Sequence, residues 1–474
     1  MLVSAYFRRH WAAPQGYREV LRIGLPMLAS MASTTVMLLT DRIFLSRYSL
    51  EAIAASSPAG MASLTLQMTF QGVCGYAAVL AAQYTGARAL GRVGAAMWQG
   101  IWCSLLCSVL LVGACFPAAA FFDFIGHEAV IRELEVKYFV VLTSGSSISL
   151  LGGAVSAYFF GRGLTKPVML ANMAAAALNI LLDYLLIFGK WGFPELGITG
   201  AAVASVSGWA LSLSVLSALV FTRGNDRAYH VLRAWRPEKA LFLRLIRFGT
   251  PGGIQFFVEF LGQTWFMFEL GHLGRIPLAA SNIAFSINSF TFMPMLGLSM
   301  ATSTLAGQAM GRGKPQDAVL VSSHALHLAF VYMLFMAGII VFFSGELIDI
   351  FRAADAPASA DFEQVRATGR ILLYYVALYS LVDAVNLIFI GALKGAGDTL
   401  MIMKIIVSCV VLALLLPIAG LHWGGFVSLH KLWIIFTVYI FILALCVALR
   451  FHSRKWQKIR VIESTPPASV PGGE

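Results

Sequence analysis

Acidic side chains inside apolar stretches are the first candidates for chemistry in this chain. Burying a carboxylate in hydrocarbon costs at least about 2.5–3.5 kcal/mol on insertion scales, so such residues usually mark ion or proton pathways. Glu269 and Asp398 lie close to the ends of apolar stretches and are weaker candidates. The acids that lie well inside such stretches are Asp41, Asp183, Glu259 and Asp383.

One pair of polar residues has the spacing of a cation site. Asp183 follows Asn179 by four residues, which puts both side chains on one face of a helix. An amide oxygen beside a carboxylate suits Na⁺, or a proton shared with a hydrogen-bonding neighbour. Asp41 would approach the same site from late in the first apolar stretch. The alternatives are a structural hydrogen-bond anchor at Asp183 and pairing of Asp41 with a neighbouring arginine.

The second half of the chain carries two polar stripes at helical spacing. Gln255, Glu259 and Gln263 repeat every four residues, and Asp383 and Asn386 lie three apart. Side chains of this kind are costly against lipid, so the stripes predict the lining of a substrate cavity. The alternative, for the amides above all, is hydrogen bonding between helices, at about 0.6–2 kcal/mol per contact.

The composition indicates that lipid surrounds most of these elements. Of 474 residues, 59% are hydrophobic and 12% are charged, and the mean hydropathy is +0.79. Twelve apolar runs are each long enough for a membrane helix, which needs about 20 residues. The runs are 22–45, 52–84, 97–121, 136–160, 167–189, 197–222, 240–271, 277–309, 320–350, 365–393, 399–421 and 425–449. We therefore predict an all-α membrane protein with twelve transmembrane helices and exclude a disordered chain, a typical soluble enzyme and a β-barrel.

The two halves of the chain resemble each other. Gly24-Leu25-Pro26 is matched by Gly249-Thr250-Pro251, Gly72 by Gly297, and Gln83 with Gly86 by Gln308 with Gly311, all at an offset of 225 residues. A second motif begins at Gly161 and recurs at Gly395, at an offset of 234. Matches at one offset indicate an internal duplication. Because six helices preserve the direction of the chain, the repeats are parallel, as in transporters whose halves rock against each other.

The placement of lysine and arginine predicts the orientation. Most of the 34 basic residues lie before the first run, in alternate loops that include Lys394, in the loop 223–239 and in the tail. The positive-inside rule then places both termini in the cytoplasm. The net charge of +11 is thus a topology signal and not a sign of nucleic acid binding. The loop 223–239 divides an N-lobe, 1–222, from a C-lobe, 240–450, and a cytoplasmic tail follows at 451–474.

Motifs for enzymatic chemistry are lacking. There is no Walker A lysine loop, so we expect no ATP-hydrolysing site in the chain. The six cysteines form no CxxC pair and are interpreted as packing residues. His324 and His327 lie three apart without a nearby third ligand, so no metal centre is predicted there. We therefore expect neither an enzyme nor a bound cofactor.

Several motifs together resemble the multidrug and toxic compound extrusion (MATE) family, over roughly Arg22 to Arg450. The motifs are Gly24-Leu-Pro26 through Thr40-Asp41-Arg-Ile-Phe-Leu-Ser-Arg47, Gln83-Tyr-Thr-Gly86, Leu178-Asn179-Ile-Leu-Leu-Asp183-Tyr-Leu-Leu-Ile-Phe-Gly189, Phe193-Pro-Glu-Leu-Gly197-Ile-Thr-Gly-Ala-Ala202, and Gly391-Ala-Leu-Lys-Gly-Ala-Gly-Asp-Thr399. Singly each is a weak signal, and together they are specific.

The resemblance implies two pseudo-symmetric six-helix lobes around a V-shaped cavity, as in the MOP superfamily. It also implies efflux of cationic or amphipathic drugs against inward Na⁺ or H⁺ by a monomer in the lipid of a bacterial inner membrane. The family's cation-binding positions fall on Asp41, Asn179 and Asp183, which would also be the Na⁺ ligands. A hydroxyl from the sixth helix completes some family sites, and Ser205 is the nearest candidate, with Thr199 second.

The resemblance leaves two matters open. Glu259 and Asp383 match the second-lobe acids of the NorM branch, whereas the fifth-helix and G-A-G-D-T motifs are similar to the DinF-like branch. The coupling ion, Na⁺ or H⁺, therefore stays undecided. The alternative function is a lipid-linked-precursor flippase of the same superfamily. Such flippases often carry arginines in the cavity, whereas the membrane interior here looks acidic, which favours cationic cargo.

Overall fold

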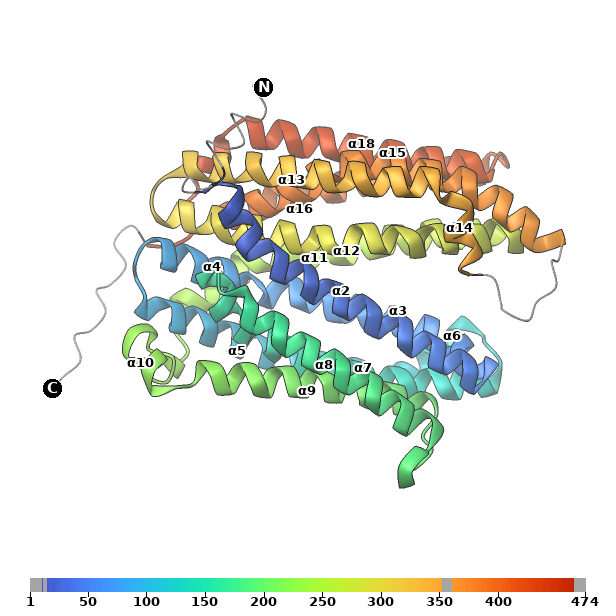
Figure 1. The fold of residues 1–474 in the computed structure, drawn as a ribbon, viewed down its shortest axis with the longest axis horizontal. Helices are drawn as coiled ribbons and strands as arrows, with labels where there is room; N and C mark the ends of the chain where they lie inside the picture. Colours follow the sequence, from blue (N-terminus) through green and yellow to red (C-terminus); the bar gives the residue numbers. More distant parts are fainter. Residues whose placement is uncertain (1–10, 12–14, 352–359, 464–474) are drawn as a thin grey trace.

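The computed structural model describes residues 11, 15–351 and 360–463. Within these residues the chain is helical and contains no β-strand. Long helices lie roughly alongside one another, and the first and last described segments lie at the same end of the molecule, called here the terminal end (Figure 1). Eleven helices in the described residues are long and apolar enough to cross a bilayer. The prediction of an all-α, multi-pass membrane protein is confirmed.

The helices of the first half are α2 (Tyr17–Tyr48), α3 (Leu50–Cys74), α4 (Tyr76–Gly86), α5 (Gly91–Cys115), α6 (Ala118–Ile125), α7 (Ala129–Arg162), α8 (Thr165–Phe188), η1 (Lys190–Gly192), α9 (Ile198–Val220), α10 (Arg223–Tyr229) and η2 (Arg233–Trp235). Those of the second half are α11 (Lys239–His272), α12 (Arg275–Gly311), α13 (Pro315–Phe342), α14 (Ser344–Asp349), α15 (Ala360–Ala396), α16 (Thr399–Cys409), η3 (Val410–Leu415), α17 (Leu416–Trp423), α18 (Leu429–His452) and η4 (Lys455–Lys458).

Four of the predicted runs are not single α-helices. The run 52–84 is divided at Gly75 into α3 and α4, and the runs 97–121 and 320–350 extend into the short helices α6 and α14. The run 399–421 contains the π-helical segment η3, and Pro417 follows it in the first turn of α17. Hydropathy reports where a segment is apolar, and it does not register where the backbone hydrogen-bond pattern changes.

The seventh run forms α11, a helix of 34 residues that is long enough to span a bilayer. It is not among the eleven apolar candidates. The polar stripe Gln255, Glu259 and Gln263 makes the middle of this helix less apolar.

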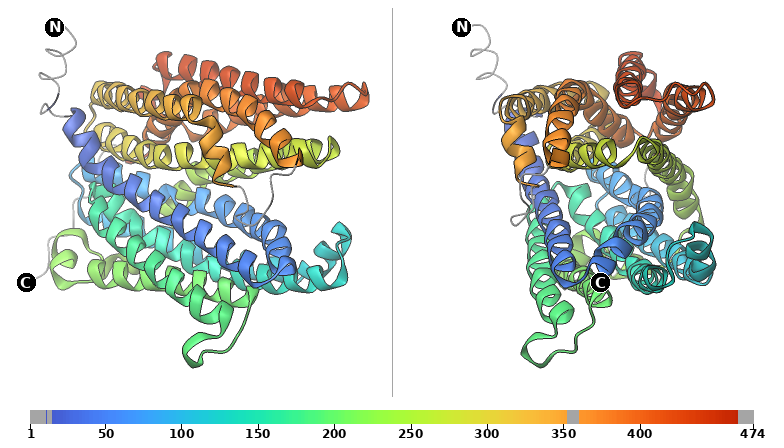
Figure 2. Two further views of the ribbon diagram at one scale, coloured as in Figure 1. Left: turned by 45° about the vertical axis from the view of Figure 1, so that its right-hand side comes forward. Right: turned by 90° about the vertical axis from the view of Figure 1, so that its right-hand side faces the viewer.

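The helices form two bundles, one from each half of the sequence, that lie side by side (Figure 2). The first helix of each half, however, begins in the core of the other bundle. Val20 and Ile23 at the start of α2 pack in the C-terminal core, and Leu241 and Leu245 at the start of α11 pack in the N-terminal core. The lobe boundary at 223–239 stays a prediction, and in the packing both first helices are shared.

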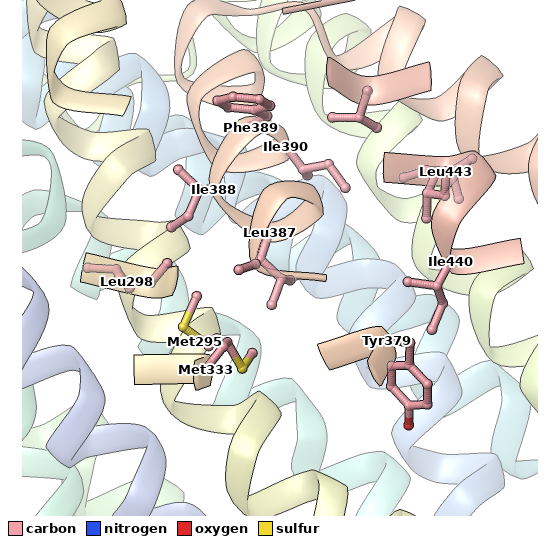
Figure 3. Close-up of a cluster of buried hydrophobic side chains, with 14 of the residues drawn as sticks. Met295, Leu298, Met333, Tyr379, Leu387, Ile388, Phe389, Ile390, Ile440 and Leu443 are labelled. Carbon is pink, nitrogen blue, oxygen red and sulfur yellow. The ribbon is translucent and has the colours of Figure 1, made fainter. Parts of the chain in front are cut away.

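The core of the second bundle is formed mainly by α12, α13, α15 and α18 (Figure 3). Met295 and Leu298 of α12 approach Met333 of α13 and Ile388 of α15, and Ile440 of α18 lies across from them. These side chains are all buried. Lipid tails are as apolar as these side chains, so their tight van der Waals packing, more than the hydrophobic effect, holds the helices together.

Glycines at repeat-related positions form the contact between the bundles. A Cβ on Gly72 of α3 would lie 2.8 Å from backbone atoms of Gly252 in α11. The equivalent Gly297 of α12 faces Met27 of α2, where a Cβ would lie 2.9 Å from the backbone carbonyl carbon. The partners Met27 and Gly252 are themselves 225 residues apart. The two contacts are therefore related by a pseudo-two-fold axis, as parallel repeats require.

The two repeated glutamines cross between the bundles at the terminal end. Gln83 Nε2 of α4 donates to the Gly395 carbonyl at 2.9 Å, and Gln308 Nε2 of α12 donates to the Gly161 carbonyl at 2.9 Å. Both glutamines are buried. Each repeat thus supplies the glutamine that binds the glycine motif of the other repeat.

The segment after α18 ties the bundles together at the same end. Trp456 is buried in the second core and Val461 in the first. Glu463 accepts hydrogen bonds from the Tyr84 hydroxyl at 2.8 Å and from the Arg244 guanidinium at 2.6 Å. The predicted tail 451–474 is therefore packed as far as Glu463, and the residues after it lie outside the described part of the chain.

Substituting Gly86 by alanine tests the close approach at the repeated glutamines. A Cβ on Gly86 would overlap the Gln308 carbonyl oxygen, so Gly86→Ala should lower stability by about 1–3 kcal/mol through a forced backbone shift. Thermal unfolding of the purified protein in detergent measures the change. The control is Gly113→Ala in α5, where an added Cβ has no atom within 4 Å and the helix gains up to about 1 kcal/mol. Equal stability of the two variants would contradict the close approach.

The ion pair of Glu463 predicts a pH-dependent tie between the bundles. Burial raises the pKa of Glu463, but its own backbone N–H, Tyr84 and Arg244 together hold the pKa below the ordinary value of 4.5. A lowered pKa stabilises the fold above the unfolded-state value, and this contribution is lost as the pH falls through the folded-state value. The stability advantage of the unsubstituted protein over Glu463→Gln should be full at neutral pH, decline as the pH falls below 4.5, and vanish once the pH is below the folded-state pKa. Thermal unfolding of both proteins at a series of pH values measures this advantage. A difference in stability that does not change with pH would refute the prediction.

Candidate functional site

Four polar side chains meet in the interior of the first bundle. Asp41 comes from α2, Asn179 and Asp183 from α8, and Ser205 from α9, and each is at most 5% exposed. Asn179 Nδ2 donates to Ser205 Oγ, and Ser205 Oγ donates to Asp41 Oδ2, each at 3.4 Å. The carboxyls of Asp41 and Asp183 lie close enough to act on each other electrostatically. The structure therefore brings together all four residues, and Ser205 rather than Thr199 supplies the hydroxyl.

Several oxygen atoms of this cluster are buried without a donor from the protein. They are Asp41 Oδ1, Asn179 Oδ1 and both carboxyl oxygens of Asp183. An unsatisfied buried polar group costs about 1–3 kcal/mol, and two facing carboxylates repel each other unless a proton or a cation lies between them. Carboxylate, amide and hydroxyl oxygens are hard ligands that suit Na⁺ or a shared proton. The donor set thus fits a small cation.

Tyr138 of α7 lies in the neighbourhood of this cluster. Its side chain is 7% exposed, and it lies close enough to Asp41 and Asp183 to feel their charges. Its hydroxyl is a donor of the kind that the facing carboxylates lack. Sequence reasoning missed it because a tyrosine in an apolar helix looks like any other packing residue.

A second polar network lies two helical turns from Asn179, between the same three helices. Asn172 Nδ2 of α8 donates to Ser30 Oγ of α2 at 2.8 Å, and Ser212 Oγ of α9 donates to Asn172 Oδ1 at 2.8 Å. Asn172 precedes Asn179 by seven residues and so lies on the same face of α8. That spacing was a signal in the sequence, although it does not reveal the serine partners.

The polar stripes of the second bundle lie on α11 and α15. Gln255 Nε2 donates to Glu259 Oε1 at 3.3 Å, and Asn386 Nδ2 donates to Asp383 Oδ1 at 3.2 Å. Glu259 and Asp383 are half-buried and interact electrostatically, and both act on Tyr439 of α18. These two bonds each lie within a single helix, and Asn386 Nδ2 also donates to the Ile440 carbonyl of α18 at 3.4 Å, which is a bond between helices. The half-buried Gln263 lies one turn further along α11.

Lys394 lies in the last turn of α15 rather than in a cytoplasmic loop, which corrects the prediction for this residue. Its ammonium lies 4.8 Å from the centre of the Phe256 ring, and its charge acts on Glu259. The half-buried position means that the interior of the second bundle holds a cation as well as acids. The loop prediction failed because hydropathy ended the tenth run at 393, whereas the helix continues to Ala396.

The weaker candidates of the sequence have structural partners. Asp398 forms a two-point ion pair with Arg450, at 2.6 and 3.1 Å. His324 and His327 contact the start of α2, where they bond the Gln15 carbonyl and the Tyr17 hydroxyl, each at 2.8 Å. These residues therefore fix helix ends and positions. Glu269 has histidine partners, which are described below.

An apolar cavity of about 490 Å³ lies between α16, η3, α17 and α18, with Cys409 and Leu412 in its wall. None of the interior acids lines it. Gln255, Gln263 and Asn386 do not line it. Their assignment to a substrate cavity stays a prediction, and so does the V-shaped cavity itself.

Comparison with known protein families shows which family the chain belongs to. The profile of the family described as MatE matches residues 26–185 and again 251–418. The chain belongs to the MatE family. The two matches fall one in each half, in agreement with the 225-residue repeat. The resemblance to MATE proteins inferred from the motifs is confirmed.

Similar proteins match most of the length of this MATE family member. "Probable multidrug resistance protein NorM" of Thermotoga maritima is 27% identical over 453 residues, 95% of each chain. "Multidrug resistance protein NorM" of Burkholderia vietnamiensis is 26% identical over 386 residues, 80% of this chain and 82% of that protein.

Solved structures share the fold. A MOP superfamily transporter from Pyrococcus furiosus superposes with a TM-score of 0.81 at 20% identity, over 92% of this chain and 95% of that one. An outward-facing multidrug resistance MATE family transporter of the MOP superfamily gives 0.79 at 20% identity, over 94% and 96% of the two chains. At this identity the likeness establishes the fold alone.

Replacing Ser205 by alanine tests the hydrogen bonds of the buried cluster. The change leaves the Asn179 amide and Asp41 Oδ2 without their partner, so we expect a loss of about 1–3 kcal/mol in stability. Ser214→Ala is the matched control, because Ser214 lies on the same helix, is exposed and bonds only the Ala210 carbonyl of its own turn. Thermal unfolding in detergent compares the two. A loss no larger in Ser205→Ala than in the control would argue against the bonds.

Proposed function

We propose that this chain is a secondary active multidrug efflux transporter. It moves cationic or amphipathic organic compounds outward and couples this step to the inward movement of Na⁺ or H⁺ by alternating access. The family membership and the names of the similar NorM proteins support the drug-like cargo. The coupling to an ion and the alternating-access cycle are argued from the geometry of the buried polar cluster and of the contacts between the bundles.

The observation that carries the proposal is the cluster of Asp41, Asn179, Asp183 and Ser205. Its buried oxygens lack protein donors, so the cluster is stable only when a proton or Na⁺ balances its charge. Occupied and empty clusters therefore favour different packing of α2, α8 and α9. A ligand that binds one packing better than the other shifts the population toward it, and this gives the coupling between ion and drug.

Two features support alternating access. The repeat-related contacts of Gln83 and Gln308 close the molecule at the terminal end. Two parallel repeats that meet along a pseudo-two-fold axis can rock so that this end opens while the other closes. Pro26 in α2 and Pro251 in α11 each remove a backbone hydrogen bond from a shared helix, which lets the helix bend during such a movement.

The proposed setting is the inner membrane of a bacterium, as a monomer with both termini in the cytoplasm. The basic loops support this orientation through the positive-inside rule. The contacts of Gln83 and Gln308 then form a cytoplasmic closure.

Transport into proteoliposomes tests the proposal. The purified protein is reconstituted, and accumulation of a fluorescent organic cation is followed under a Na⁺ gradient and, separately, under a pH gradient. One gradient should drive transport, and Asp183→Asn should abolish it, because the amide neither carries a proton nor balances a cation. Asp317→Asn in the first turn of α13 is the control and should retain transport.

The other outcomes are equally informative. Unchanged transport by Asp183→Asn at equal protein content would remove Asp183 from the mechanism. Movement of a fluorescent lipid reporter without any cation gradient, in place of the organic cation, would favour the flippase alternative.

A further inference from the structure

A carboxylate and two imidazoles, side chains of the kind that bind metal ions, meet at the end of the second bundle opposite the terminal end. Glu269 and His272 lie in the last turn of α11, and His422 lies in the last turn of α17. One ligand atom from each lies within 4.8 Å of the others. The sequence does not reveal this group, because His422 is far from α11 in the chain and follows the π-helical segment η3.

The distances are close to those of ligands around one metal ion. Glu269 Oε2 lies 3.1 Å from His422 Nδ1 and 3.9 Å from His272 Nδ1. Zinc holds nitrogen and oxygen ligands at about 2.0–2.2 Å, so neighbouring ligand atoms lie about 3–3.5 Å apart. The centres of the two imidazole rings are 6.0 Å apart, and a small rotation of the exposed His272 closes the remaining gap.

Burial and access also fit a bound ion. The Glu269 side chain is 1% exposed, whereas the His272 and His422 side chains are 52% and 48% exposed. Glu269 Oε1 is buried without a hydrogen-bond partner. A buried carboxylate with an unused oxygen, covered by two solvent-facing imidazoles, gives a cation a charged ligand and a path of entry.

The helix ends add to the attraction. Both α11 and α17 end at this point, and each helix C-terminus carries a partial negative charge from its free carbonyl groups. Two imidazoles with one carboxylate suit a borderline metal such as zinc, whereas Mg²⁺ and Ca²⁺ prefer oxygen ligands alone.

We propose that Glu269, His272 and His422 form a Zn²⁺ site with a further position open to water. The ion replaces the imidazole protons that otherwise bond the carboxylate, and it ties the end of α11 to the end of α17. Glu259 lies ten residues before Glu269 on the same helix, about 15 Å along its axis. Zinc at this end therefore restrains the helix that carries an interior acid without occupying the acid's own position.

Zinc binding to the full-length protein tests the site. The protein is purified without a histidine tag, treated with a chelator and desalted, and ZnCl₂ is added during calorimetric titration and thermal unfolding. We expect one Zn²⁺ per chain and a higher midpoint of unfolding, and MgCl₂ at the same concentration should have no effect. Retention of zinc after desalting, measured by mass spectrometry, gives the stoichiometry.

His272→Ala is the decisive variant, because it leaves the buried bond between Glu269 and His422 intact. It should weaken zinc binding at least tenfold while its midpoint without metal stays the same. His430→Ala is the control, since His430 is an exposed histidine near the same end of the bundle and is not a ligand. Tight binding by His272→Ala, loss of binding in His430→Ala, or no saturable binding to the unsubstituted protein would each overturn the proposal.

Discussion

The close approach of backbones between the two bundles is the constraint on which the rest of the structure depends. Gly72 against Gly252, and Gly297 against Met27, bring helices of different halves together without a side chain between them. In lipid there is little hydrophobic drive to hold two helices together, so association depends on close packing and on hydrogen bonds between helices. The crossed glutamines Gln83 and Gln308 supply such bonds.

This constraint links the interface to the buried acids. The start of α2 packs in the second core, and the same helix later carries Asp41 into the first bundle. The start of α11 packs in the first core, and the same helix later carries Glu259 into the second bundle. A shift of one bundle against the other therefore acts on helices that hold one acid each. In each helix the proline precedes the acid: Pro26 comes before Asp41, and Pro251 comes before Glu259.

The two bundles have the same arrangement of helices but different distributions of buried charge. In the first, Asp41 and Asp183 face each other among oxygen atoms that lack donors. In the second, the charge of Lys394 acts on Glu259, and each acid has an amide within its own helix. In the proposed mechanism a bound proton or Na⁺ balances the charge of the first bundle, whereas Lys394 supplies a positive charge within the second. The duplication fixed the packing positions, and the polar positions diverged.

The sequence by itself determined the membrane class, the duplication and the acids in the interior. Hydrophobic runs, a constant offset between repeated motifs and rare charges within apolar runs are local or periodic features, so they can be recognised in the linear sequence. The family resemblance also placed Ser205 beside Asp41, Asn179 and Asp183. Only the tertiary structure decided the rest: the crossed first helices, the exchange of glutamines, Tyr138, the position of Lys394, the tie at Glu463 and the group around Glu269. Each depends on contacts between residues far apart in the chain, and hydropathy carries no information on which faces of two helices meet.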